Sequence, residues 1–145
     1  MTITEAALQK IERLVFSNRL PTAESLNQEG YDKLLDKRDA DEFAVPWTDA
    51  YEVSKAPFKQ LAVDQGVKAR IDKLREYVYE RVYSQTKVSN LASYTSDDID
   101  LILRYLLTAV PSMWANSLWL CYEEGAIPSG TLNEIPGNLA ELITA

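Results

Sequence analysis

The sequence contains no histidine, one cysteine and only five glycines in 145 residues. Without histidine, the chain lacks the imidazole base of Ser-His-Asp and Cys-His sites and a common zinc ligand. The single cysteine, Cys121, has no second cysteine with which to form an internal disulfide, a CxxC redox pair or a cysteine-rich metal site. The glycine loops G-x-x-x-x-G-K-[ST] and G-x-G-x-x-G are also missing. We therefore expect a protein that is not an enzyme, with no cofactor and no metal site.

Targeting and membrane signals are equally sparse. The first residues, MTITEAALQK, show no basic region followed by an apolar one, so no secretory signal is predicted there. Together with one unpaired cysteine, this favours a cytoplasmic protein. An uncharged stretch of 18 residues, Tyr105–Tyr122, reaches the lower limit for a membrane span. Because it contains Pro111, Asn116 and three serine or threonine residues, we interpret it as a central bundle helix instead.

The composition predicts one all-α domain over residues 1–145. Hydrophobic residues make up 46% of the chain, enough for a packed core, and no repeat or flexible linker divides it. There is no Asn-Gly or Asp-Gly hairpin signal, whereas apolar residues recur at helical intervals. We expect a bundle of five to seven helices.

Capping signals and prolines place these helices. Thr2 has capping-box spacing with Glu5, and a second start signal lies at Ser25, with Gly30 inside the predicted helix. Residues 39–57 are the least regular stretch, with a short helix from about residue 48, and Pro57 suits a first helical position. The expected helices cover residues 2–18, 25–35, a short segment from about 48, 57–86, 96–124 and 139–143.

Two of the expected helices contain an interruption. The long central helix, 57–86, is expected to bend or break at Gly66, because it would otherwise extend about 45 Å. The stripe over 96–124 is predicted to begin with Thr95 and Asp98 as a capping pair. Pro111 interrupts this stripe, which leaves either one kinked helix or two helices.

Acidic residues outnumber basic ones by 22 to 15, giving a net charge of −7 and a pI near 4.6. The net charge is −4 over residues 1–55, +3 over 56–87 and −6 over 88–145. The basic middle helix is interpreted as a solvated, internally paired face. A phosphate-binding stripe with interleaved tyrosines is the alternative, and the overall charge opposes it. We expect no direct nucleic-acid or membrane binding, and a basic protein partner.

Two acidic groups and two aromatic side chains are the candidate contacts with such a partner. Neither acidic group has the D-x-[DN]-x-[DN]-G pattern of a calcium loop. Trp47 lies beside Pro46, where an aromatic ring serves either to clamp the core or to anchor a partner. The candidate partner-binding residues are Asp36, Asp39, Asp41, Glu42, Trp47, Tyr51, Asp97, Asp98 and Asp100.

These observations favour an acidic protein-binding module, an inhibitor or immunity-type protein that covers a basic partner such as a nuclease or nucleic-acid-targeting complex. Bacterial immunity proteins and phage-encoded inhibitors are similar in size, charge and helicity, although no motif here matches a particular family. The alternative is a structural or regulatory helical subunit. It would form homo- or hetero-oligomers through an apolar face of the 57–86 or 105–122 segment. The sequence leaves the oligomeric state open.

Overall fold

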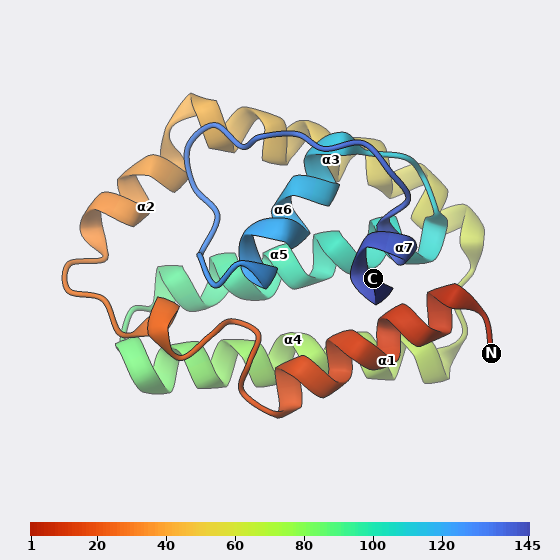
Figure 1. Ribbon diagram of the computed structural model, residues 1–145, viewed down its shortest axis with the longest axis horizontal. Helices are drawn as coiled ribbons and strands as arrows, with labels where there is room; N and C mark the ends of the chain where they lie inside the picture. Colours follow the sequence, from red (N-terminus) through yellow and green to blue (C-terminus); the bar gives the residue numbers. More distant parts are fainter.

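Seven α-helices and one 3-10 turn, with no strand, build residues 1–145 in the computed structural model (Figure 1). The all-α prediction of five to seven helices is confirmed. The elements are α1 (Ile3–Phe16), η1 (Glu24–Leu26), α2 (Asp32–Asp39), α3 (Asp41–Leu61), α4 (Gln65–Thr86), α5 (Ser89–Thr108), α6 (Met113–Glu123) and α7 (Leu139–Thr144).

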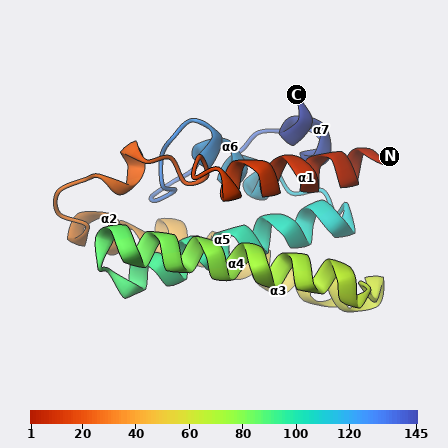
Figure 2. The same ribbon diagram turned by 90° about the horizontal axis from the view of Figure 1, so that it is seen from below.

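Helix α5 forms the centre of the bundle. It lies between α3 and α4 in Figure 1 and also packs against α1, α6 and α7. Twelve of its twenty residues are buried, far more than a one-sided amphipathic stripe would bury. Seen from below, α1, α6 and α7 lie in one layer and α3, α4 and α5 in another (Figure 2). The buried apolar side chains of both layers form one cluster of 29 residues.

The N-terminal region follows the sequence prediction only at first. Thr2 caps α1, because its hydroxyl accepts a 3.0 Å hydrogen bond from the Glu5 amide. The prediction of one helix over residues 25–35 is wrong. Ser25 instead donates its hydroxyl to the Thr22 carbonyl within a 3-10 turn, and α2 begins only at Asp32. Gly30 precedes α2 with φ of +70°, a left-handed conformation that ends any helix there and favours glycine.

Helix α3 corrects the prediction of an irregular stretch over residues 39–57. It is continuous for 21 residues and contains both Pro46 and Pro57, so neither proline starts or ends a helix. Each proline removes one backbone hydrogen bond, to the carbonyl of Glu42 or of Val53. Both of these residues are exposed, so water can solvate the freed carbonyls.

The predicted helix over residues 57–86 is two helices. Residues 57–61 complete α3, and Ala62 ends it in the left-handed conformation with φ of 50°. Asp64 then caps α4, since its side chain accepts a 2.9 Å hydrogen bond from the Val67 amide. The break therefore precedes Gly66, which lies within the first turn of α4.

The segment predicted over residues 96–124 is also a pair of helices, which settles the alternative left open by Pro111. Helix α5 begins at Ser89, so Thr95 is not a cap and donates its hydroxyl to the Leu91 carbonyl. Ala109 ends α5 with φ of 57°, and Ser112 caps α6. None of the helices is both long enough and apolar enough to span a bilayer.

Candidate partner-binding site

The junction between α2 and α3 carries a concentrated negative charge. We call Asp36, Asp39, Asp41 and Glu42 the acidic edge; all four side chains are exposed. Ala40 separates the two helices with an extended backbone, φ −74° and ψ 152°, so the four residues gather at one corner. None of them forms an ion pair within 4.0 Å. Across residues 29–49, seven exposed acidic side chains face only two exposed basic ones, which leaves this surface strongly negative.

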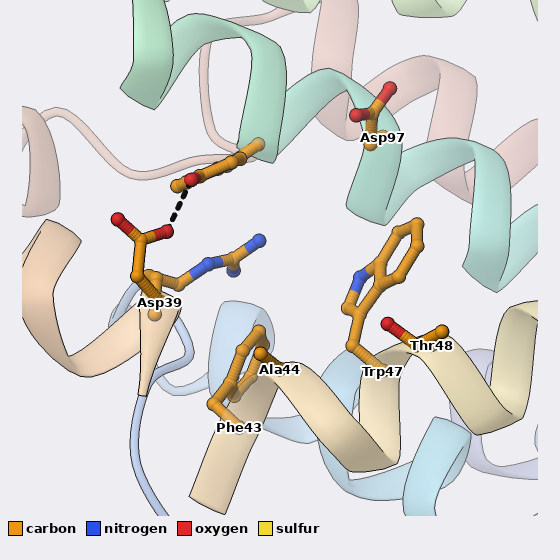
Figure 3. A pocket seen from close by; sticks show the side chains of 8 residues that line it. Asp39, Phe43, Ala44, Trp47, Thr48 and Asp97 are labelled. Carbon is orange, nitrogen blue, oxygen red and sulfur yellow. Dashed lines mark hydrogen bonds between the residues drawn. The ribbon is translucent and has the colours of Figure 1, made fainter. Parts of the chain in front are cut away.

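Beside the acidic edge, a small hollow opens between α3 and α5 (Figure 3). Its volume is about 160 Å³, which is below the roughly 300–1,000 Å³ typical of small-molecule pockets. Figure 3 shows Trp47 rising from α3 toward Asp97 on α5, with Asp39 on the opposite side of the hollow. The lining residues are Arg38, Asp39, Phe43, Ala44, Trp47, Thr48, Tyr94 and Asp97.

Arg38, one of the residues that line this hollow, belongs to a buried ion pair. Asp98 has no exposed surface and Arg38 is 5% exposed. The Arg38 guanidinium donates two hydrogen bonds to the Asp98 carboxylate, at 2.6 and 2.9 Å, and a third to the Pro128 carbonyl at 3.2 Å. Burial disfavours the charged guanidinium, but the negative charge of Asp98 and the hydrogen bonds to it outweigh burial and raise the pKa of Arg38. The positive charge of Arg38 is therefore neutralised inside the protein.

Two more donors complete the coordination of Asp98. The Trp47 indole N–H donates to Oδ1 at 2.9 Å, and the Tyr122 hydroxyl donates to Oδ2 at 2.6 Å. Burial, followed by the charge of Asp98, raises the pKa of Tyr122 well above its usual value. Together with Arg38, this network joins α2, α3, α5 and α6 around a single carboxylate.

The two aromatic candidates lie side by side on α3. The rings of Trp47 and Tyr51 stack with centroids 5.6 Å apart, and both residues are half-buried. The Arg104 guanidinium lies 5.0 Å from the Tyr51 ring centroid. Tyr51 thus supports Trp47 from one side, while Trp47 both anchors to Asp98 and lines the hollow.

The three predicted aspartates of α5 have different environments. They lie in the middle of the helix, not in its first turn. Asp98 is buried, and Asp100 is 9% exposed and paired with Arg104 at 3.0 Å, so neither is available to a partner. The Asp97 side chain keeps 46% of its surface exposed and pairs with Arg75 at 3.1 Å. Burial raises the pKa of Asp97, and its acidic neighbours add to this effect while Arg75 opposes it.

The sequence did not reveal the roles of Arg38 and Tyr94. Arg38 lies among Lys33, Asp36 and Lys37 in a charged segment whose pattern indicates a solvated helix. The Tyr94 hydroxyl donates to Asp39, and this hydrogen bond, with burial, raises the pKa of Tyr94. Neither contact follows from sequence spacing, because the hydrogen-bonded residues lie 55 and 60 positions apart.

The two carboxylates that line the hollow are engaged by Tyr94 and Arg75. No group of three or more acidic or cysteine side chains is placed to hold a metal ion. Burial raises the pKa of Cys121, which disfavours its reactive thiolate form. The lining of the hollow is charged and partly aromatic.

Exposed apolar side chains are dispersed over the molecule. They lie at the N-terminus, along α3, on α4 and at the start of α6, and within residues 105–122 only one large apolar side chain is exposed. The residues are Met1, Ile3, Val45, Val53, Leu61, Tyr79, Tyr83 and Met113. The oligomeric subunit alternative therefore gains no support from the 105–122 segment.

The fold and this site define an all-helical protein whose most distinctive surface is an uncompensated acidic edge beside an aromatic hollow. A comparison with protein-family models matches residues 10–129 to the family described as Immunity protein PIM1. The match covers most of the chain, from within α1 to beyond α6, and includes the acidic edge and every residue of the hollow. The chain therefore belongs to the PIM1 immunity protein family. A search of curated proteins found no match.

Proposed function

We propose that this immunity protein acts without catalysis, by binding a basic partner protein through the acidic edge and the adjoining hollow. The main support for this proposal is that four exposed carboxylates lie together at the α2–α3 junction and none of them has an ion-pair partner. Proteins that act on nucleic acids expose basic clefts, which such a surface complements. A nuclease or a nucleic-acid-targeting complex is the kind of partner proposed.

The distribution of basic residues supports this proposal. On α4, Arg70 pairs with Glu5 and Glu12 of α1 at 2.9 and 2.5 Å, and Arg75 pairs with Asp97 of α5. These arginines therefore join helices instead of forming a phosphate-binding stripe. The positive charge of α4 is therefore partly neutralised by ion pairs within the fold, whereas the carboxylates of the acidic edge are exposed to solvent.

The single buried cluster supports treating residues 1–145 as one binding unit. The network around Asp98 ties α2 and α3 to α5 and α6, so the acidic edge is held in a fixed orientation. A preorganised charged surface speeds association and loses little entropy when it binds.

The test begins with a partner captured from the native host, identified by mass spectrometry and then purified. Its association rate is measured at low and high salt with the wild type and with the variant Asp36→Lys, Asp41→Lys, Glu42→Lys. This variant leaves every residue of the hollow unchanged. We expect association at low salt to slow by about 10-fold or more and its salt dependence to flatten.

A matched control reverses three exposed acidic residues on α4, as Asp72→Lys, Glu76→Lys and Glu80→Lys. Each set changes the net charge by the same amount, so only location distinguishes them. Slower association of the edge variant alone supports the proposal. Equal effects of both sets, or no effect of either, would show that the acidic edge is not the binding surface.

A further inference from the structure

We infer that the hollow beside the acidic edge takes an arginine side chain of the partner protein. This inference rests on the proposed function and gives it a specific anchor. The hollow of about 160 Å³ is too small for a typical metabolite and suits one long side chain. It opens directly beside Asp39, so a partner drawn to the acidic edge would reach it.

The walls have the chemistry that favours a guanidinium. The Trp47 and Tyr94 rings line the hollow, and aromatic faces attract cations, arginine most often among side chains. The same kind of contact already occurs at this site, because the Arg38 guanidinium lies 4.3 Å from the Phe43 ring centroid and 5.0 Å from that of Tyr94. A second planar guanidinium would stack in the same aromatic surroundings.

The charges around the hollow also favour a cation. Tyr94 and Arg75 contact only the Oδ1 atoms of Asp39 and Asp97, which leaves each Oδ2 without a hydrogen-bond donor in the structure. Figure 3 shows these two aspartates on opposite sides of the hollow. Asp98 neutralises Arg38 and Arg75 pairs with Asp97, so Asp39, which has no ion-pair partner, sets the sign of the local potential. An anionic side chain would meet repulsion from Asp39.

Arginine fits this site better than lysine for two physical reasons. Its planar guanidinium stacks on aromatic rings and is more weakly hydrated than an ammonium group, so less energy is needed to desolvate it. Its several N–H groups also allow hydrogen bonds to carboxylates on different sides. A lysine ammonium would offer a compact charge without the stacking surface.

The test uses the tripeptides Gly-Arg-Gly, Gly-Lys-Gly and Gly-Glu-Gly, with blocked termini, as probes of the isotope-labelled full chain. Binding is followed by NMR through the indole N–H resonance of Trp47 and the backbone amides of Asp39, Thr48 and Asp97. We expect the arginine peptide to shift these signals, the lysine peptide to bind more weakly and the glutamate peptide to leave them unchanged.

Variants locate the binding. Thr48→Met fills the hollow without changing any charge, and Val45→Met adds similar bulk at an exposed position of α3 outside it. We expect Thr48→Met to weaken binding of the arginine peptide about 10-fold and Val45→Met to leave its binding unchanged. Asp39→Asn and Asp97→Asn should each weaken binding by about two- to five-fold. Circular dichroism confirms that each variant is folded.

Several results would overturn the inference: no shift with the arginine peptide, equal binding of the lysine or glutamate peptide, or unchanged binding to Thr48→Met. Failure here is separable from failure of the proposed function. If the Asp36, Asp41 and Glu42 variant associates slowly but no arginine peptide binds, only the inference about the hollow is refuted. If the arginine peptide binds but that variant associates at the wild-type rate, the acidic edge is refuted as the partner-binding surface.

Discussion

Replacing Asp98 with asparagine should destabilise the protein strongly, although the side-chain volume hardly changes. In the wild type, the Asp98 carboxylate accepts four hydrogen bonds, from Arg38 twice, Trp47 and Tyr122. Asparagine keeps one carbonyl oxygen and places an NH₂ group where the second oxygen accepted hydrogen bonds. Arg38, which is 5% exposed, would remain buried without its counter-ion.

The structure sets the expected magnitude. Removing one partner of a buried ion pair costs about 3–5 kcal/mol, because the other charge stays desolvated and uncompensated. For a chain of this length, each kcal/mol lowers the melting temperature by about 2–4 °C. The Asp98→Asn variant should therefore melt roughly 6–20 °C below the wild type. Urea denaturation followed by circular dichroism gives the free energy of unfolding directly.

A double-mutant cycle separates the ion pair from the loss of hydrogen bonds. Arg38→Met leaves Asp98 buried with only its Trp47 and Tyr122 donors and should also be strongly destabilising. In the double variant Arg38→Met/Asp98→Asn, the amide oxygen can accept from the Trp47 indole, the NH₂ group can donate to the Tyr122 hydroxyl, and no charge is left without a partner. Its loss of stability should be smaller than the sum of the two single losses by about 2 kcal/mol.

The neighbouring residue supplies the control. Asp97→Asn removes the same charge from the next position, but at a side chain that is 46% exposed, so its effect should stay within about 1 kcal/mol. The reasoning is refuted if Asp98→Asn lowers the free energy of unfolding by less than Asp97→Asn does. It is also refuted if the losses of stability in Arg38→Met and Asp98→Asn simply add in the double variant.

Two further predictions concern the backbone and alkaline pH. Ala62→Gly, at the left-handed end of α3, should stabilise the protein by about 0.5–1 kcal/mol in urea denaturation. As a control, Ala69→Gly, at an exposed position inside α4, should lower the free energy of unfolding by about 1 kcal/mol. If Ala62→Gly and Ala69→Gly both destabilise the protein, the left-handed backbone at residue 62 is not strained. Because the folded state raises the pKa of Tyr122 above its usual 10.0, the stability this tyrosine contributes is full below pH 10 and is lost as the pH rises further. Stability measured from neutral to alkaline pH should fall less steeply in Tyr122→Phe than in the wild type, and identical slopes would contradict this role.

Much of the architecture was predictable because it depends on local signals. The capping pair at Thr2, the interruption at Pro111 and the short C-terminal helix all follow from side chains close to the backbone that they control. The predictions failed where packing outweighed a local preference. Pro46 and Pro57 lie inside α3, which buries Phe43, Ala50 and Ser54 along one face and so offsets two missing hydrogen bonds.

The candidate site was predictable in part for the same reason. The acidic edge is a run of charged residues around a helix junction, and its exposure is the usual state of such a run. The sequence predicts surface positions for both Asp97 and Asp98, since nothing in it distinguishes two adjacent aspartates. Arg38, Tyr94 and Tyr122 contribute to the site only because distant helices meet around α5.

Composition and periodicity by themselves determined the helical class, the negative charge and the exclusion of chemistry that needs histidine, since each is a sum over residues or a repeat along the chain. Tertiary structure alone decided which charges reach solvent. Successive residues of a helix point about 100° apart, so Asp97 lies at the rim of the hollow while Asp98 faces inward. The arginine, indole and phenol groups that satisfy that inward carboxylate come from three other helices, and only packing brings them together.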